Sequence, residues 1–162
     1  MSNLRAAPLK ADQIDAAWAL LSLTGNRRGN LDEWRTFAKE SVDARNMQPS
    51  ETGVMAIQCQ RGYIYGLFSY IIENDPVHVR VLTVEPLAIA RMAHSESPTD
   101  VMVRTADLLA RDFRCRAIHL MVSADQSDGS GLQETGEQYG YRLTARRLCK
   151  ELEVKASHSG NS

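Results

Sequence analysis

The sequence predicts an α+β fold in which a mixed, mostly antiparallel central sheet is flanked by helices. Two helical patterns come before a run of three strand patterns, and a helix, a strand and a further helix follow that run. Short turns between the three strands predict antiparallel pairing, whereas a helix that connects two strands predicts one parallel pair. The 162 residues suffice for one core, so we expect a single domain over residues 1–155 and a flexible polar tail over residues 156–162.

The composition is that of an ordinary globular chain, and it argues against several classes of function. The 19 Lys and Arg side chains oppose 20 Asp and Glu side chains, so no overall basic field exists to attract nucleic acid or an anionic membrane surface. The most apolar run, residues 63–72, is too short to cross a bilayer as a helix. Three widely spaced cysteines fit neither a disulfide framework nor a zinc site. We therefore expect a cytoplasmic protein with no nucleic-acid and no membrane partner.

The first third of the chain predicts a short strand and two helices. Residues 4–8 have an extended pattern, and an apolar stripe at helical spacing follows and ends near Gly25. Asn30, with Glu33 three residues later, has the spacing of a capping box at the start of the second helix. The expected buried positions are Ile14, Ala17, Trp18 and Leu21 in the first helix, and Trp34, Phe37, Ala38 and Val42 in the second.

The middle of the chain predicts three antiparallel strands. They cover residues 54–59, 63–72 and 78–84, with turns at residues 60–62 and 73–76. Pro86 has no backbone N–H to donate to a neighbouring strand, so we expect the third of these strands to end before it.

The remaining part predicts a helix, a strand, a helix and a final strand. Ser97 is placed as N-cap, Pro98 as the first helical residue and Asp100 as the acid of a capping box. This helix is expected to end near Phe113 and to bury Val101, Thr105, Leu108 and Leu109. A buried strand over 117–122, a polar loop over 125–131, a helix over 132–139 and a strand or strand pair over 143–154 follow.

In this order of elements and in two short motifs, the chain resembles the GCN5-related N-acetyltransferase superfamily. The motifs are Thr83-Val84-Glu85-Pro86 at the end of the fourth strand and Glu137-Gln138-Tyr139-Gly140-Tyr141, which is similar to the family's Y-x-x-x-G-F region. The resemblance covers nearly the whole chain and implies the acyl-CoA N-acyltransferase fold. It also implies that acetyl-CoA, as co-substrate, lies between the fourth and fifth strands and acetylates an amine of a small molecule or a peptide.

The loop that would hold the cofactor's pyrophosphate departs from the family pattern. That family places small residues there, in a Q/R-x-x-G-x-G/A motif, so that backbone N–H groups and a helix N-terminus can approach the anion. Residues 87–97 contain no glycine, and Glu96 would stand beside the phosphates as a like charge. The resemblance then implies a degenerate loop in which side chains replace backbone donors. The cofactor-binding residues that it implies are Thr83, Val84, Arg91, His94 and Ser95.

The resemblance also implies a general base and a general acid for the transfer. Glu85, at the end of the fourth strand, is the candidate base, with Glu73 as the weaker alternative. The family's acid is often a tyrosine four residues before the glycine of its G-F pair, and here that position is Gly136. Tyr139 is the nearest phenol, and both an acid role and a packing role fit it.

Two classes of function stay open at this point. One is an acetyl-CoA-dependent N-acetyltransferase, which requires that the fourth and fifth strands part and leave a gap. The other is a catalytically inactive domain of the same fold that serves as a binding or assembly module, with the gap filled by Met92, His94 or residues 125–131. The four histidines lack the spacing of a metal site, and the expected assemblies include a homodimer.

Overall fold

The computed structural model describes residues 3–24, 29–47, 50–92, 96–123 and 131–153 and contains one five-stranded sheet of order β1-β2-β3-β4-β5. The strands are β1 (Arg5–Pro8), β2 (Thr52–Gln58), β3 (Ile64–Asp75), β4 (Val79–Ile89) and β5 (Ala117–Leu120). The helices are α1 (Ile14–Leu23), preceded by a short 3-10 turn η1 (Ala11–Gln13), α2 (Leu31–Met47), α3 (Pro98–Asp112) and α4 (Leu132–Gln138). Strands β2, β3 and β4 pair antiparallel and β4 and β5 pair parallel, as predicted, and β1 adds a further antiparallel pair with β2. No helix in the described ranges is long and apolar enough to cross a membrane.

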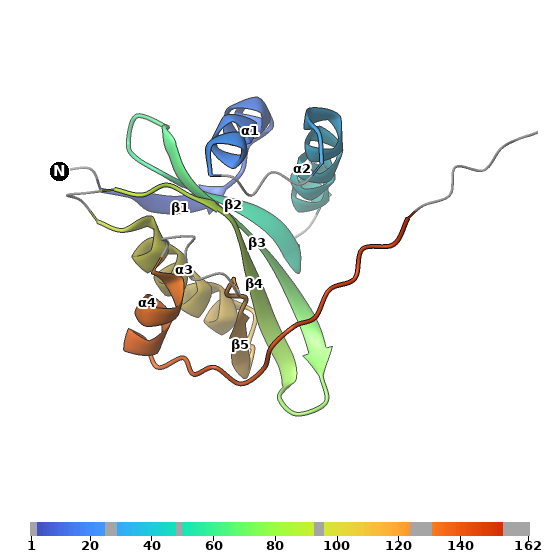
Figure 1. The fold of residues 1–162 in the computed structure, drawn as a ribbon, viewed down its shortest axis with the longest axis vertical. Helices are drawn as coiled ribbons and strands as arrows, with labels where there is room; N and C mark the ends of the chain where they lie inside the picture. The colour runs from blue at the N-terminus through green and yellow to red at the C-terminus, as the bar shows by residue number, and fades with distance from the viewer. Residues whose placement is uncertain (1–2, 25–28, 48–49, 93–95, 124–130, 154–162) are drawn as a thin grey trace, which may run out of the picture.

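Helices cover both faces of the sheet. Helices α1 and α2 lie on one face, and α3 and α4 lie on the other (Figure 1). The core on the α1 and α2 side consists of Leu9, Ala17, Leu20, Leu21, Trp34, Ala38, Val54, Ala56, Leu67 and Ala88. The core on the α3 side is built around Leu4, Met55, Ile57, Cys59, Phe68, Ile72, Leu82, Val84, Val101, Met102, Val103, Ala106, Ala110 and Leu132. The strands therefore bury alternate side chains against two separate helical layers.

Helix α2 begins with the predicted capping box, and one of its predicted buried side chains is exposed. The Glu33 N–H donates to Asn30 Oδ1 and the Asn30 N–H donates to Glu33 Oε2, both at 2.9 Å. Trp34 and Ala38 are buried, whereas Phe37 is 47% exposed, so its predicted burial is wrong. Trp34 Nε1 donates to the Ile14 carbonyl oxygen at 2.8 Å, which sets the rotation of α2. Because each residue turns the helix by about 100°, Phe37 points well away from the direction of Ala38.

Strand β4 starts and ends later than expected. Residues 73–75, predicted as a turn, pair with β4, and the turn follows them, where Asp75 Oδ1 accepts the Val77 and His78 N–H groups at 2.8 and 2.7 Å. The strand also continues past Pro86, contrary to the prediction. Pro86 pairs with Phe68 at a β-bulge, and this irregular position tolerates a residue without an N–H.

Helix α3 begins with the predicted N-cap and proline, but the cap bond comes from Thr99 rather than from Asp100, and the helix buries a different set of side chains. Ser97 Oγ accepts the Thr99 N–H at 3.2 Å, and Pro98 is the first helical residue. The buried apolar positions of α3 are Val101, Met102, Val103, Ala106 and Ala110. Leu108 is 61% exposed, so its predicted burial is wrong. Strand β5 is only half-buried, because it is the edge strand and helices pack mainly over its neighbours.

The last described segment, residues 141–153, contains no strand, so the predicted strand or strand pair over 143–154 is wrong for these residues. Leu148 is 99% exposed, and Leu143 and Leu152 are exposed as well. The segment runs away from the body of the fold (Figure 1). An extended segment becomes a strand only when a neighbouring edge pairs with it. The predicted tail, residues 156–162, lies outside the described residues.

Candidate active site

Strands β4 and β5 part at Val84. Their parallel pairing joins residues 81–84 to residues 117–120, and the Met121 N–H donates to the Val84 carbonyl oxygen at 2.9 Å. Beyond this point β4 continues to Ile89 beside β3 alone, within the described residues. The N-terminus of α3 lies near the end of β4. Gly66 of β3 pairs with Ile89, and a Cβ added at Gly66 would lie 3.5 Å from the Cβ of Pro98, the first residue of α3. The fold thus brings a strand edge and a helix N-terminus to one place.

A groove of about 360 Å³ lies on the other face of the sheet from α3, between α2 and the sheet, and reaches Glu85 of β4. Its sheet wall is formed by Ser69, Ile71, Thr83 and Glu85, and its helix wall by Phe37, Glu40, Ser41 and Ala44. The strand residues are alternate positions of paired strands, and the helix residues are spaced three, four and seven apart, so each set shares one face of its element. Glu85, predicted as the base, therefore lines a cavity and directly follows the last residue paired with β5.

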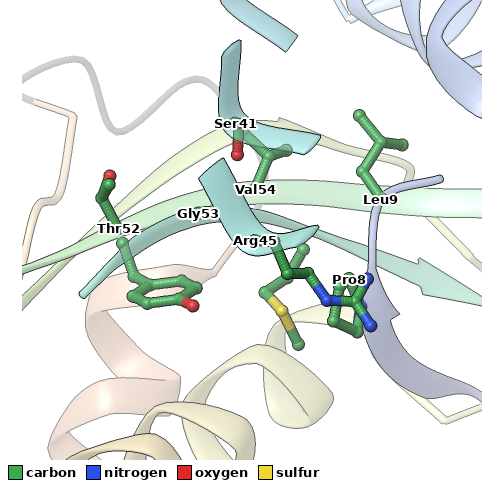
Figure 2. A pocket seen from close by; sticks show the side chains of 9 residues that line it. Pro8, Leu9, Ser41, Arg45, Thr52, Gly53 and Val54 are labelled. Carbon is green, nitrogen blue, oxygen red and sulfur yellow. The ribbon is translucent and has the colours of Figure 1, made fainter. Parts of the chain in front are cut away.

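A small pocket adjoins the groove at the edge of the sheet, beyond the end of β1. The two share Ser41, Tyr70 and three consecutive residues of β2, Thr52, Gly53 and Val54. Figure 2 shows this pocket, with Arg45 on the α2 side beside Pro8. Its volume of about 10 Å³ is room for roughly one water molecule, so the larger groove is the place for a substrate.

The two predicted bases differ in their hydrogen bonding. The Thr83 hydroxyl donates to Glu73 Oε2 at 3.0 Å. In the described part of the chain, no group bonds to the Glu85 carboxylate, which is exposed to the groove. Glu85 is thus free to accept a proton from a ligand, whereas Glu73 is tied to Thr83 on the same face of the sheet.

The predicted cofactor-binding residues fall into two groups. Thr83 and Val84 lie in the last paired positions of β4 beside β5, where the Val84 side chain is buried and Thr83 faces the groove. Arg91 is exposed just after β4, while His94 and Ser95 lie outside the described residues. At the start of α3, Glu96 forms an ion pair with Arg104. Glu96 thus engages the guanidinium that could otherwise contact an anion at this helix end.

Neither tyrosine of the second motif lines the groove. Tyr139, at the C-terminal end of α4, is 40% exposed, which leaves both the acid role and the packing role as predictions. Helix α4 packs on the α3 side of the sheet, which is the face opposite the Glu85 side chain. Tyr141 packs against the α3-side core, and burial raises the pKa of its phenol. Gly136 is buried against Tyr141. A Cβ added at Gly136 would lie 3.6 Å from the Tyr141 Cβ, so this position has little room for a tyrosine.

Sequence reasoning missed most of the groove. It treated Phe37 as a core residue and gave no role to Glu40, Ser69 or Ile71. Two signals were available in the sequence. One is a second stripe on α2 at helical spacing, formed by Phe37, Glu40 and Ala44, and the other is the alternate polar positions of β3 and β4. Among the described residues, no three His, Cys, Asp or Glu side chains are grouped to hold a metal ion.

No protein-family model and no curated protein matches this sequence, but solved structures match its fold. An acetyltransferase of Trypanosoma brucei superposes with a TM-score of 0.67 at 17% identity and covers 93% of this chain and 100% of its own. Aminoglycoside N-acetyltransferase AAC(6')-Iy in complex with CoA has a TM-score of 0.72 at 12% identity, over 95% of this chain and 97% of its own. Glucosamine-6-phosphate N-acetyltransferase from Arabidopsis thaliana has a TM-score of 0.67 at 14% identity, over 93% and 99%.

Proposed function

We propose, from the premise that this chain has the acyl-CoA N-acyltransferase fold of the GCN5-related N-acetyltransferases, that it transfers an acetyl group from acetyl-CoA to an amine. The observation that carries the proposal is the position of Glu85. Its carboxylate, which has no partner among the described residues, lines a groove of about 360 Å³ directly after the last residue of β4 that pairs with β5. A structure of the same fold in complex with CoA supports an acyl-CoA as the donor.

In this proposal the amine and the acetyl donor approach β4 from two different sides. The groove under α2 receives the amine, and Glu85 takes the proton that the nitrogen must lose. Bound acetyl-CoA supplies the thioester carbonyl that the amine attacks; a C–N bond forms, the C–S bond breaks, and the departing sulfur takes a proton. The proposed acid for that last step is the exposed Tyr139 hydroxyl.

The residues present fit the arm of acetyl-CoA better than its pyrophosphate. In the described structure β4 pairs with β5 only as far as Val84, so we place the arm of the donor beside the stretch of β4 beyond it. The proposed pyrophosphate contacts are Arg91, His94 and Ser95. Near them, the Glu96–Arg104 ion pair and a proline as the first residue of α3 reduce what the helix N-terminus offers.

Calorimetric titration with acetyl-CoA and with CoA tests the proposal, together with a thermal-shift assay, because a ligand that binds only the folded state raises its stability. We expect saturable micromolar binding and acetylation of amines. Arg91→Ala should weaken binding, whereas Arg111→Ala, which removes the same charge at the far end of α3, should not. Glu85→Gln should abolish most of the acetylation at neutral pH while the affinity for CoA is retained.

The second candidate is a binding or assembly module without catalysis. It is favoured by one observation, the Glu96–Arg104 ion pair at the start of α3 in a loop that lacks glycine from residue 87 to 97. No heat and no thermal shift at millimolar acetyl-CoA would contradict the enzyme and favour this module.

For the assembly, we propose a homodimer. Strand β5 has only β4 as a neighbour among the described residues, and the exposed Leu143, Leu148 and Leu152 follow in a segment that forms no strand. Such an edge and such apolar side chains are what a second chain can cover. Light scattering coupled to size-exclusion chromatography would give the mass, and a monomer at 100 μM would contradict this proposal.

A further inference from the structure

The groove beside Glu85 has acidic and apolar walls and no basic one. Two of its residues are carboxylates, Glu40 on α2 and Glu85 on β4, and no Lys, Arg or His of the described residues lines it. Neither carboxylate has an ion-pair or hydrogen-bond partner in the described part of the chain. In a cavity partly shielded from water, two unpaired carboxylates attract a cation and repel an anion.

The apolar part of the groove consists of large side chains that the fold leaves uncovered. Phe37 of α2 is 47% exposed and Ile71 of β3 is 42% exposed, and both line the groove. Phe37 stands three residues before Glu40, so the ring and the carboxylate share one face of α2. An acceptor in this groove would therefore contact apolar side chains, which suit an alkyl chain, as well as carboxylates.

We propose that the acceptor is an aliphatic primary amine that carries a second cationic group, and that Glu40 is the residue that selects it. This inference rests on the proposed function of the groove as the acceptor site. The reacting amine lies at Glu85, the alkyl chain lies against Phe37 and Ile71, and the second ammonium group pairs with Glu40. Glu40 binds the acceptor and takes no proton in the reaction.

The same geometry disfavours acceptors with an anionic end. Arg45 lines the small adjoining pocket rather than the groove. Figure 2 shows its guanidinium group beside Pro8, at the end of β1. A carboxylate or phosphate bound in the groove would face Glu40 without a cation lining the same cavity.

Three acceptors of matched length test the proposal: 1,5-diaminopentane, pentylamine and 5-aminopentanoate, each at saturating acetyl-CoA. We expect the diamine to have the highest kcat/KM and 5-aminopentanoate the lowest. Glu40→Gln should raise KM for the diamine about threefold to fivefold, the effect of one partly exposed ion pair, with kcat unchanged and pentylamine unaffected. Asp43→Asn removes an equal charge from α2 outside the groove and should change nothing.

Direct binding separates this inference from the proposed function. Titration of the protein with 1,5-diaminopentane and with pentylamine, without donor, should give tighter binding of the diamine, lost in Glu40→Gln and kept in Asp43→Asn. Equal use and equal binding of the two amines, or preference for 5-aminopentanoate, would overturn the selection by Glu40 while acetylation stands. If acetyl-CoA does not bind and no amine is acetylated, the proposed function fails, and the diamine titration alone decides whether Glu40 binds a cation.

Discussion

The hydroxyl of Tyr141 is a buried polar group whose removal should stabilise the protein. Its oxygen is inaccessible to water and has no hydrogen-bond partner among the described residues, while the ring packs against the α3-side core. An unsatisfied buried donor costs about 1–3 kcal/mol. Tyr141→Phe keeps the ring and deletes that group, so we expect the free energy of unfolding to rise by about 1 kcal/mol. For a chain of this length that corresponds to a melting temperature higher by about 3 °C.

Tyr70→Phe is the matched control, because its hydroxyl has a partner. Tyr70 Oη donates to the Ser50 carbonyl oxygen at 3.2 Å. Its removal should cost about 0.5–1.5 kcal/mol, so the two substitutions have opposite signs. Urea and thermal unfolding followed by circular dichroism measure both. A loss of stability in Tyr141→Phe equal to that in Tyr70→Phe would refute the reasoning, since it would mean that the Tyr141 hydroxyl has a hydrogen-bond partner.

The same burial has a consequence at alkaline pH. Burial of each phenol raises its own pKa, that of Tyr141 strongly and that of Tyr70 to a smaller degree. Above about pH 10 an unfolded tyrosine loses its proton, whereas in the folded protein the raised pKa values delay this loss to higher pH. Stability therefore falls as the pH rises beyond that value. The fall should be shallower in Tyr141→Phe, and an identical slope in both proteins would contradict the raised pKa.

Three further predictions concern the helices. Asn30→Ala removes the N-cap of α2 and should cost about 1 kcal/mol in urea unfolding, while Asn30→Asp, which keeps an accepting oxygen, should cost much less; equal losses would contradict the cap. Arg35 bonds both carboxylate oxygens of Asp15, at 2.9 and 3.1 Å, and holds the pKa of that carboxyl below its ordinary value. Any stabilisation by this pair is therefore present above about pH 4 and is lost as the pH falls through the lowered pKa; in an NMR titration Arg35→Gln should return the Asp15 pKa towards normal, and an unchanged pKa would exclude the pair as its cause. Glu96→Gln removes the acid at the start of α3 and frees Arg104, so calorimetry should show CoA bound about twofold to fivefold more tightly; an unchanged Kd would mean that Glu96 does not face the anion.

The helix starts could be predicted from sequence because their interactions are local. The bonds between Asn30 and Glu33 and the one from Thr99 to Ser97 join residues no more than three apart. Such contacts form in the same way wherever the helix is placed in the fold. The order of helices and strands, and with it the parallel pairing of β4 with β5, could likewise be predicted from local periodicity and connection length.

The candidate site could be predicted only in part. Glu85 was predicted from the motif over residues 83–86, which lies inside β4 rather than at its end, but Phe37 and Glu40 were not predicted as neighbours across the groove. Which face of α2 turns to the sheet depends on the bond from Trp34 to Ile14, which lies 20 residues earlier in the chain. No pattern within α2 alone contains that contact.

The amino-acid sequence was enough to predict the succession of elements from β1 to α4 and the N-caps of α2 and α3, because periodicity, capping and turn chemistry act over a few residues. The tertiary structure decided what depends on partners distant in the chain. Strand β4 passes Pro86 because β3 accommodates it at a bulge, and residues 141–153 form no strand although their pattern predicted one. Whether a strand forms and where it ends depend on the neighbouring strand with which it pairs, so its extent is fixed only when the whole sheet is assembled.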